Sequence, residues 1–395
     1  MSYSYTNSDF SEEDIALLQL SLCDGIGPKL SYQLLEIAGS AKALFQTVNN
    51  KTGAMPNSFV GLGPQKLLQL QQASSLAEAH DVLKIHQKLN IGMVTINHSH
   101  YPHRIKEQSG APLVLFYQGN TTWNLEYSVA VVGTRKPSQR GLSITQEIVT
   151  NLQHHMPRPW FTVSGLAMGI DAMAHKSSVD IKIPSIGIVA HGLEQIYPRN
   201  HKRLTQEIVE QGGAILSEHP AYTKMHPNLF PRRNRLVAAL SDALLIVESG
   251  TSGGSMVTAG IACHLNKDVF AIPGHPKDSQ STGCNSLIQE CMAHLCTSAE
   301  DILDKMNWRK TEKKLSLEPL QINTISSNPN QNLFNEQQRE ILRLIDAGNS
   351  RVQDLTAALP FWTIAEILAI TSHLQIQGML VRENNQEFRI LRHSH

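Results

Sequence analysis

The sequence has no excess of charge of either sign and few aromatic residues. Its 395 residues include 34 Lys and Arg and 34 Asp and Glu, and only 6% are Phe, Trp or Tyr. The net charge of zero excludes a uniformly basic nucleic-acid binder, so any DNA binding has to come from local charge. Because 41% of the residues are hydrophobic, the chain is also too apolar for a disordered protein.

Long hydrophobic runs and a cysteine framework are missing as well. The longest apolar stretch, 236–247, is interrupted by Ser241 and Asp242, whereas a membrane-spanning helix needs about 18 apolar residues. The first residues lack the basic and apolar segments of a signal peptide. The 5 cysteines are an odd number spread thinly, which implies no disulfide scaffold. We therefore expect a cytoplasmic protein that has no membrane partner.

Motifs for metals and common cofactors are also lacking. The sequence contains no CxxC, no HExxH and no zinc-finger spacing. The glycine-rich stretch 250–255 has no Lys and so is not a Walker A loop, and no GxGxxG follows the first strand of the central segment. We predict that the protein uses no metal and no cofactor.

Residues 1–85 are predicted to form a helical domain. Gly-Ile-Gly-Pro at 25–28 and Gly-Leu-Gly-Pro at 61–64 each predict a tight turn that Pro closes by starting a helix. Such turns are typical of a helix-hairpin-helix or SAM-like domain. Amides in the hairpin could face a DNA phosphate, but residues 1–75 hold more acidic than basic groups, which favours a plain helical docking module.

Residues 86–306 alternate short apolar strands with helical patterns. Continuous apolar strands separated by helices predict a mostly parallel sheet that is buried on both faces. We therefore expect an α/β, Rossmann-like doubly wound sheet that binds its ligand at the carboxyl ends of the strands. The six expected strands are 127–132, 160–163, 186–190, 214–216, 243–247 and 269–272.

The C-terminal part is predicted to be a linker followed by a winged helix. Residues 307–335 are polar and rich in Lys, Asn and Ser, whereas 336–395 show three helical patterns and a hairpin that turns at Asn384 and Asn385. The expected helices are 336–347, 352–359 and 363–377, and the hairpin is 378–391. Because the third helix has no Lys or Arg, contact with protein is expected rather than DNA reading.

Glycine-containing turns follow four of the expected strands, and an arginine cluster precedes the fifth. Glycines let a backbone approach an anion, and amides at helix starts favour negative charge. Guanidinium groups grip phosphates bidentately, so the combination predicts a site for several phosphates. The candidate residues are Gly133, Arg135, Lys136, Ser164, Gly165, Gly169, Arg232, Arg233, Asn234, Arg235, Gly254, Ser255 and Gly274.

Two plainer interpretations stand beside this site. The glycines alone could simply allow tight packing, although their coincidence with strand ends and arginines favours binding. Asp171 and His175 lie one helical turn apart and could act as an acid–base pair. We favour a helix-start Asp followed by a packed His.

The motifs, taken in order, resemble the DprA/Smf family of bacterial DNA-processing proteins. The resemblance covers about residues 95–295 and rests on Val-Val-Gly-Thr-Arg at 131–135, Ser-Gly-Leu-Ala-Met-Gly-Ile-Asp at 164–171, Phe-Pro-Arg-Arg-Asn-Arg at 230–235 and Gly-Cys-Asn-Ser-Leu-Ile at 283–288. It implies a non-enzymatic protein that binds and protects single-stranded DNA and loads RecA recombinase onto it during natural transformation. It also implies a homodimer formed through the Rossmann-like domain.

The resemblance assigns roles to particular residues. Carried over by position, it makes Arg135, the Ser164–Gly165 turn, Arg233 and Arg235, with Asn234 between them, contacts to DNA. It also adds Asn285 to the candidates. We therefore expect that replacing Arg233 and Arg235 by Glu abolishes single-strand binding and leaves the fold intact.

The chain departs from the family in ways that affect binding. Met168 stands where many relatives have Arg, which removes one phosphate contact. Only Tyr197, Tyr222 and Phe230 near the motifs could stack on bases. With so few stacks, we expect binding that tolerates any sequence and weakens steeply with salt.

Two other functions remain open. One is a Rossmann-like nucleotide phosphoribohydrolase, although such enzymes place a Glu shortly after the Gly-Gly turn and residues 256–262 hold no carboxylate. The other is a winged-helix transcription regulator, against which the uncharged third helix argues.

Overall fold

The chain folds into two compact units, Met1–Glu312 and Lys313–His395, and each is described by itself. The computed structural model describes residues 10–49, 63–73, 75–157, 159–309, 336–360, 362–376, 379–382 and 387–390. Three sequence predictions therefore fall partly outside the described residues: the hairpin at 61–62, the linker from 310 onward, and the turn at Asn384 and Asn385.

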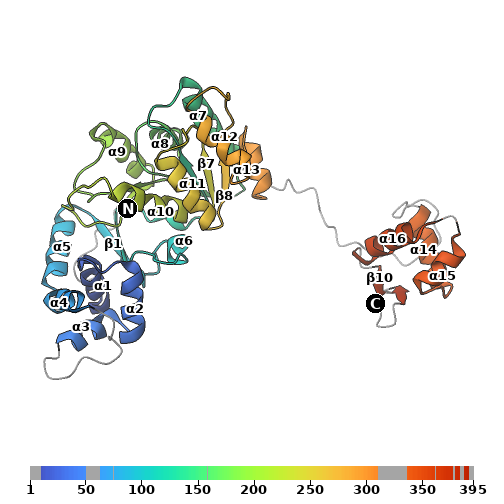
Figure 1. Cartoon of the computed structure of the whole chain (residues 1–395), viewed down its shortest axis with the longest axis horizontal. Helices are drawn as coiled ribbons and strands as arrows, with labels where there is room; N and C mark the ends of the chain where they lie inside the picture. The colour runs from blue at the N-terminus through green and yellow to red at the C-terminus, as the bar shows by residue number, and fades with distance from the viewer. Residues whose placement is uncertain are drawn as a thin grey trace. The chain divides into compact units, whose positions relative to one another are not determined.

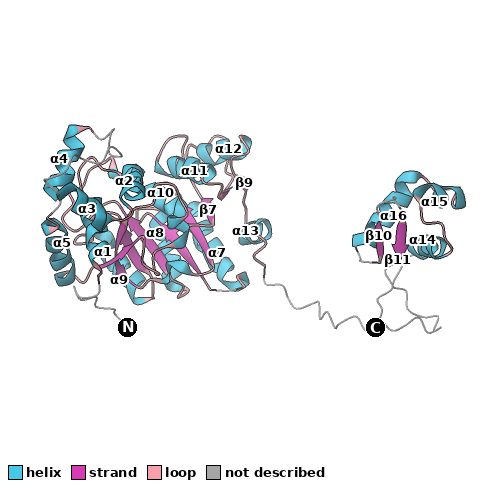
Figure 2. Cartoon of the chain, turned by 90° about the horizontal axis from the view of Figure 1, so that it is seen from below, coloured by secondary structure: helices cyan, strands magenta, loops and turns pink. Residues whose placement is uncertain are grey.

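A nine-stranded sheet forms the centre of the first unit, in the order β1-β2-β6-β5-β4-β3-β7-β8-β9 (Figure 2). The seven strands from β6 to β9 in this order run parallel, and β2 pairs antiparallel with β1 and with β6. The mostly parallel α/β sheet is thus confirmed. The strands are β1 (Gly92–Thr95), β2 (Val114–Gly119), β3 (Tyr127–Val132), β4 (Trp160–Ser164), β5 (Ser185–Val189), β6 (Ala214–Ser217), β7 (Ala243–Ile246), β8 (Asp268–Ala271) and β9 (His294–Leu295).

Alternate residues of the central strands are buried on opposite faces of the sheet. In β3, Ala130 and Val132 belong to one hydrophobic cluster, whereas Val129 and Val131 belong to another. Helices cover both clusters, which is why these strands are apolar without alternation. The helices are α6 (His103–Lys106), α7 (Gln139–His155), α8 (Ile170–Asp180), α9 (Lys202–Glu210), α10 (Leu229–Leu240), α11 (Gly254–His264), α12 (Thr282–Gln289) and α13 (Ala299–Lys305).

Five N-terminal helices gather at one end of this unit, drawn in blue in Figure 1. Gly25, at φ +71°, turns the chain between the first two, and Pro28 starts the second. Leu17 and Leu18 share one hydrophobic cluster with Val114 of β2, so the helices pack onto the sheet rather than forming a separate core. The helices are α1 (Glu12–Leu22), α2 (Pro28–Ala38), α3 (Ala41–Asn49), α4 (Pro64–Ala73) and α5 (Ala77–Lys88).

The second unit contains three helices and a two-stranded antiparallel sheet. They are α14 (Glu336–Asp346), α15 (Val352–Ala358), α16 (Ile364–Ile376), β10 (Leu380–Arg382) and β11 (Phe388–Ile390). A small core that includes Ile341, Leu355, Ile367 and Phe388 holds them together. In neither unit does a described helix combine the length and the hydrophobicity needed to cross a membrane.

Candidate functional site

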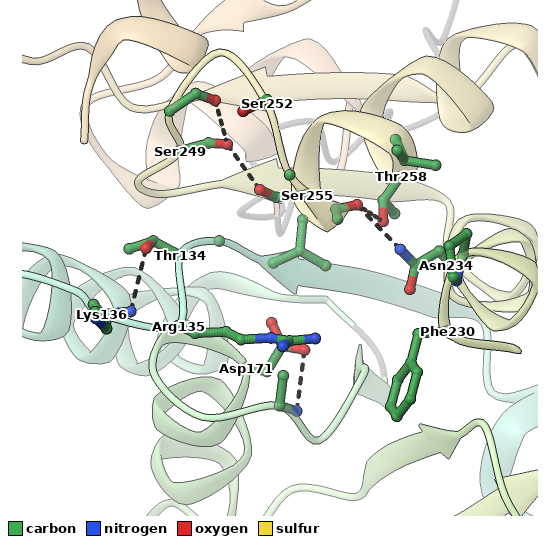
Figure 3. Close-up of a pocket in the computed structure, with 18 of the residues that line it drawn as sticks. Thr134, Arg135, Lys136, Asp171, Phe230, Asn234, Ser249, Ser252, Ser255 and Thr258 are labelled. Atoms are coloured by element: carbon green, nitrogen blue, oxygen red, sulfur yellow. Dashed lines mark hydrogen bonds between the residues drawn. The ribbon is translucent and has the colours of Figure 1, made fainter. Parts of the chain in front are cut away.

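A cavity of about 900 Å³ opens at the carboxyl ends of β3, β4 and β7 (Figure 3). The turns that the sequence places after these strands therefore meet at one place, as a parallel sheet requires. Residues that line the cavity include Gly133, Thr134, Arg135 and Lys136 after β3, Ala167 and Asp171 after β4, Ser249, Gly250, Ser252, Gly253, Gly254, Ser255 and Thr258 after β7, Tyr197, and Phe230, Arg233 and Asn234 of α10.

Two of the helices that begin at this cavity, α7 and α8, have a carboxylate of the protein beside their N-termini. Glu248 accepts hydrogen bonds from the Ser138 amide at 2.8 Å and the Ser138 hydroxyl at 2.5 Å, immediately before α7. Asp171, in the first turn of α8, accepts from the amides of Gly165 at 3.1 Å and Ala167 at 3.3 Å. A negative charge beside a helix N-terminus is stabilising, so at α7 and α8 a side chain of the protein already supplies it.

The N-terminus of α11 carries no such carboxylate. Gly253, Gly254 and Ser255 form it, and a Cβ added to Gly253 would meet nothing within 4 Å. The first amides of a helix have no partner within the helix, so they are directed at the cavity as donors. The Ser255 and Ser249 hydroxyls lie 2.8 Å apart beside them. The start of α11 is therefore the open anion position of this site.

The other predicted glycines serve tight packing instead of cradling an anion. A Cβ on Gly169, which has φ +84°, would lie 2.3 Å from the Thr134 carbonyl oxygen, and one on Gly133 would lie 2.6 Å from Ile170 Cγ1. Gly133 and Gly169 therefore allow close packing of the backbone and do not cradle an anion.

Gly274 and Asn285 form a closed pair outside the lining of the cavity. The Gly274 amide donates to Asn285 Oδ1 at 3.1 Å, and Asn285 Nδ2 donates to the Gly274 carbonyl at 3.0 Å. The lining of the cavity contains neither residue. Their predicted role as DNA contacts therefore receives no support from their positions.

Arg233 lies inside the protein with only 7% of its surface exposed. Its Nη1 donates to the carbonyls of Gly165 after β4 and Ile188 in β5, and its Nε donates to Asn234 Oδ1 at 3.2 Å. Burial lowers the pKa of Arg233 to about 10, a shift that the charge of Asp171 opposes, so the side chain stays cationic at neutral pH. The guanidinium joins two strand ends, which corrects the expectation that a Glu here would leave the fold intact.

The two neighbouring arginines of α10 have different surroundings. Arg235 forms an ion pair with Glu218 and donates to the Gly110 carbonyl at 3.4 Å. Arg232 is exposed. Of the three predicted phosphate-binding arginines, Arg232 is thus the one that presents its charge to solvent. Asn234 joins two helices, because its Nδ2 donates to the Gly254 carbonyl at 3.1 Å at the start of α11.

Ser164 is fully buried, and its hydroxyl donates to the Val131 carbonyl at 2.6 Å. It therefore connects β4 to β3 and does not face the cavity, contrary to its predicted role in DNA contact. The adjacent Gly165 contributes its amide to Asp171 and its carbonyl to Arg233, so its polar groups are also used internally.

Exposed cations face the open start of α11 across the cavity. Arg135 and Lys136 are exposed and line the cavity from the β3 side. Within the described ranges, neither side chain makes a hydrogen bond or an ion pair. An incoming anion can therefore bind them without displacing an internal partner.

Two aromatic rings stand at the rim. Tyr197 and Phe230 line the cavity with ring centroids 6.0 Å apart and planes at 61°, and Tyr197 is 49% exposed. Both were among the three aromatics that the sequence offers for base stacking. Tyr222 does not line the cavity.

The packing interpretation of Asp171 and His175 is confirmed. His175 is fully buried, its Nδ1 lies 2.7 Å from the Ser185 hydroxyl, and burial lowers its pKa to about 3. Burial raises the pKa of Asp171, while the charge of Arg233 opposes the rise. Each group thus has its own structural partners. Among the described side chains, no group of His, Cys, Asp and Glu is arranged to hold a metal ion.

Sequence reasoning missed Glu248, which decides which helix start is open. Its partner Ser138 is 110 positions away, so spacing along the chain gives no signal. The burial of Arg233 did have a signal. Leu236, Val237 and Leu240 are buried on α10, and Arg233 precedes them by three, four and seven positions, on the same helical face.

Comparison with known proteins agrees with the motifs. Residues 92–307 match the family described as DNA recombination-mediator protein A. The DNA processing protein DprA of Bacillus subtilis is 35% identical over 233 residues, which are 58% of this chain and 76% of that protein. Protein Smf of Synechocystis is 32% identical over 286 residues, 70% of this chain and 69% of that protein. The X-ray structure of DprA from Streptococcus pneumoniae covers 75% of this chain and 98% of its own, with 28% identity and a TM-score of 0.61. The chain therefore belongs to the DNA recombination-mediator protein A family.

Proposed function

We propose that this protein binds single-stranded DNA at the cavity and acts as a recombination mediator without catalysing a reaction. The observation that carries the proposal is that the open start of α11 lines the same cavity as Arg135 and Lys136, two exposed cations that make no side-chain hydrogen bond or ion pair with any described residue. Backbone amides at a helix start and mobile cationic side chains bind phosphate without reading sequence.

A basic surface extends the site beyond the cavity. Arg199, Lys202 and Lys224 are exposed in the stretch between Tyr197 and α10, and Arg232 is exposed in the first turn of α10. Phosphates leaving the cavity in this direction would meet further positive charge. The site thus suits an extended polyanion rather than a single nucleotide.

The aromatic rim favours a single strand over a duplex. Bases of a single strand present open faces that can stack on Tyr197 and Phe230, whereas the bases of a duplex are already stacked on each other. Every base has such a face, so this contact also tolerates any sequence.

The way the carboxylates near the cavity are used supports the proposal of a non-enzymatic role. A phosphoribohydrolase needs a free carboxylate at the substrate, but Asp171 and Glu248 are buried and hydrogen-bonded to the protein. We expect no release of free base when the protein is incubated with nucleoside monophosphates, and such release would favour the hydrolase alternative.

We further propose that the protein protects single-stranded DNA and loads RecA onto it, in natural transformation and recombination, as a homodimer formed through the Rossmann-like domain. These steps rest on the family resemblance. The second unit is proposed to be a winged helix that contacts protein. Its third helix, α16, exposes Ile364 and Leu368 and has no Lys or Arg, which suits a protein partner better than a DNA groove.

The proposal is tested by replacing Arg135 and Lys136 together with Glu. We expect the affinity for a fluorescent single strand, measured by anisotropy, to fall by at least tenfold for each lost charge contact, while the melting temperature is unchanged. A matched control is Lys182→Glu, an exposed-loop change between α8 and β5, at the end of the sheet opposite the cavity. Unchanged affinity in the double variant would overturn the site.

A further inference from the structure

A tight turn near the cavity places a tyrosine where a glycine is normally required. In residues 220–223 the Thr223 amide donates to the Pro220 carbonyl at 3.3 Å, and the Thr223 hydroxyl donates to the same oxygen at 2.7 Å. Tyr222, at the third position, has φ +65°. Turns with positive φ at this position favour Gly or Asn, and a bulky side chain there strains the backbone. Strained residues persist only where the surroundings hold them.

The surroundings of the turn do hold it. The Ala221 amide donates to His86 Nε2 at 2.9 Å, and the His86 ring packs edge-on against Phe116 with centroids 4.6 Å apart. Burial lowers the pKa of His86 to about 4, so the ring is neutral at pH 7 and Nε2 can accept this bond. Helix α5 and strand β2 therefore fix the residue before Tyr222.

The turn also packs against the loop that leads to Tyr197. A Cβ added to Gly192 would lie 2.6 Å from the Pro220 carbonyl oxygen and 2.8 Å from Ala221 Cα, so the two backbones are in direct contact. Tyr197, at the cavity rim, and Tyr222, outside it, are thus carried by adjoining loops.

The strained side chain is presented to solvent rather than to the core. Tyr222 is 66% exposed, more than Tyr197 at 49%. The exposed Lys224 follows two residues later. Burial lowers the pKa of the neighbouring His219; the charge of Glu218 opposes this shift, and the charges of Arg235 and Arg232 add to it. An exposed ring among cations suits a nucleic acid better than an apolar partner.

We propose that Tyr222 is a second base-stacking position for single-stranded DNA, outside the cavity, where the strand continues past Arg232. This inference rests on the proposed function. The proposal accounts for a tyrosine at this strained position. A glycine would relieve the backbone strain but would have no ring on which a base could stack.

The test uses Tyr222→Gly and Tyr222→Phe in the full chain. Glycine relieves the strain, so Tyr222→Gly raises the melting temperature and at the same time weakens binding of a fluorescent oligothymidylate by about tenfold, the effect of one lost stack. Tyr222→Phe keeps the ring, so its affinity stays within about twofold of the wild type. The control is Asn266→Gly, which also relieves a positive φ, at the end of α11 remote from the cavity, and leaves DNA affinity unchanged.

A binding role predicts that Tyr222→Gly has a higher melting temperature and a lower DNA affinity, whereas a structural role predicts a lower melting temperature. If Tyr222→Gly binds the oligonucleotide as tightly as the wild type while the Arg135→Glu, Lys136→Glu variant does not, the stacking position is refuted and the cavity site stands. If Tyr222→Gly lowers the melting temperature, the ring is structural and the inference is also refuted. If the wild type itself fails to bind the oligonucleotide, the proposed function falls.

Discussion

Replacing Arg233 by Met tests whether this arginine holds the strand ends together or contacts DNA. The substitution removes a charge that is 93% buried and leaves the carbonyls of Gly165 and Ile188 without this donor. It also removes the positive charge that opposes the rise in the pKa of Asp171. Methionine matches the aliphatic stem of arginine, so the effect measured is that of losing the guanidinium group with its charge and donors.

The expected loss of stability is large. Removing one partner of a pair of buried opposite charges costs about 3–5 kcal/mol. Asp171 keeps its bonds to the amides of Gly165 and Ala167, so the lower end, about 3 kcal/mol, is expected here. For a unit of this size that corresponds to a fall in melting temperature of about 5 °C.

The pH dependence of this loss identifies its origin. In the wild type the pKa of Asp171 is raised by burial and lowered in part by Arg233, so without Arg233 it rises further. A carboxyl whose pKa is raised on folding destabilises the fold above that pKa, and the penalty disappears as the pH falls through it. The deficit of Arg233→Met should therefore shrink as the pH is lowered, and adding Asp171→Asn should recover part of it.

The adjacent Arg232→Met is the matched control, followed by thermal unfolding and by binding to a single strand. Arg232 is exposed, so its replacement should change stability by less than about 0.5 kcal/mol and should weaken DNA binding. If Arg233→Met melts at the wild-type temperature and loses DNA affinity instead, the assignment of Arg233 to the interior is refuted.

Three further predictions concern the cavity and its support. Gly169→Ala should cost about 2–4 kcal/mol in unfolding experiments, because its Cβ would clash with the Thr134 carbonyl at a positive φ, and an unchanged midpoint would contradict this packing. Gly254→Ala should fold normally, since its Cβ has ordinary contacts, so a fall of its melting temperature comparable to that of Gly169→Ala would contradict the open helix start. Folding stability should decrease as the pH falls from about 6.5 toward 4. Burial lowers the pKa of His86 to about 4, so over this range the unfolded chain binds the proton and the folded protein does not. Replacing His86 by Gln should remove this part of the pH dependence.

The parallel strands of the sheet could be predicted because each one is a continuous run of apolar residues in the sequence. Each of the six expected strands is present with ends within one residue, since strands buried on both faces are apolar throughout. Strands β1, β2 and β9 were missed. The apolar run at the start of β2 is visible in the sequence. Its antiparallel pairing with β1 and β6 depends on contacts between segments that are distant along the chain, and these leave no local pattern. Strand β9 has only 2 residues, too few for any periodicity.

The site was predicted in position but not in the role of each residue. Strand ends and glycines locate the cavity, because parallel topology brings them to one edge. What each polar group does depends on partners that are distant along the chain: Glu248 occupies the start of α7, and Arg233 bonds with carbonyls 68 and 45 positions away. Three arginines within four positions look alike in the sequence, whereas helix α10 turns one inward, one toward Glu218 and one to solvent.

The salt dependence of binding shows whether this cavity and its cations bind single-stranded DNA through phosphates. Affinity for a single strand, a duplex and a nucleoside monophosphate is measured between 50 and 300 mM salt, a range of about sixfold. With Arg135, Lys136 and Arg232 each neutralising one phosphate, the logarithm of the single-strand binding constant should fall linearly with the logarithm of salt at a slope of about −2, or more steeply if Arg199, Lys202 and Lys224 also take part, and both other ligands should bind more weakly. A flat salt dependence, or tighter binding of the duplex or of the mononucleotide, would contradict the account.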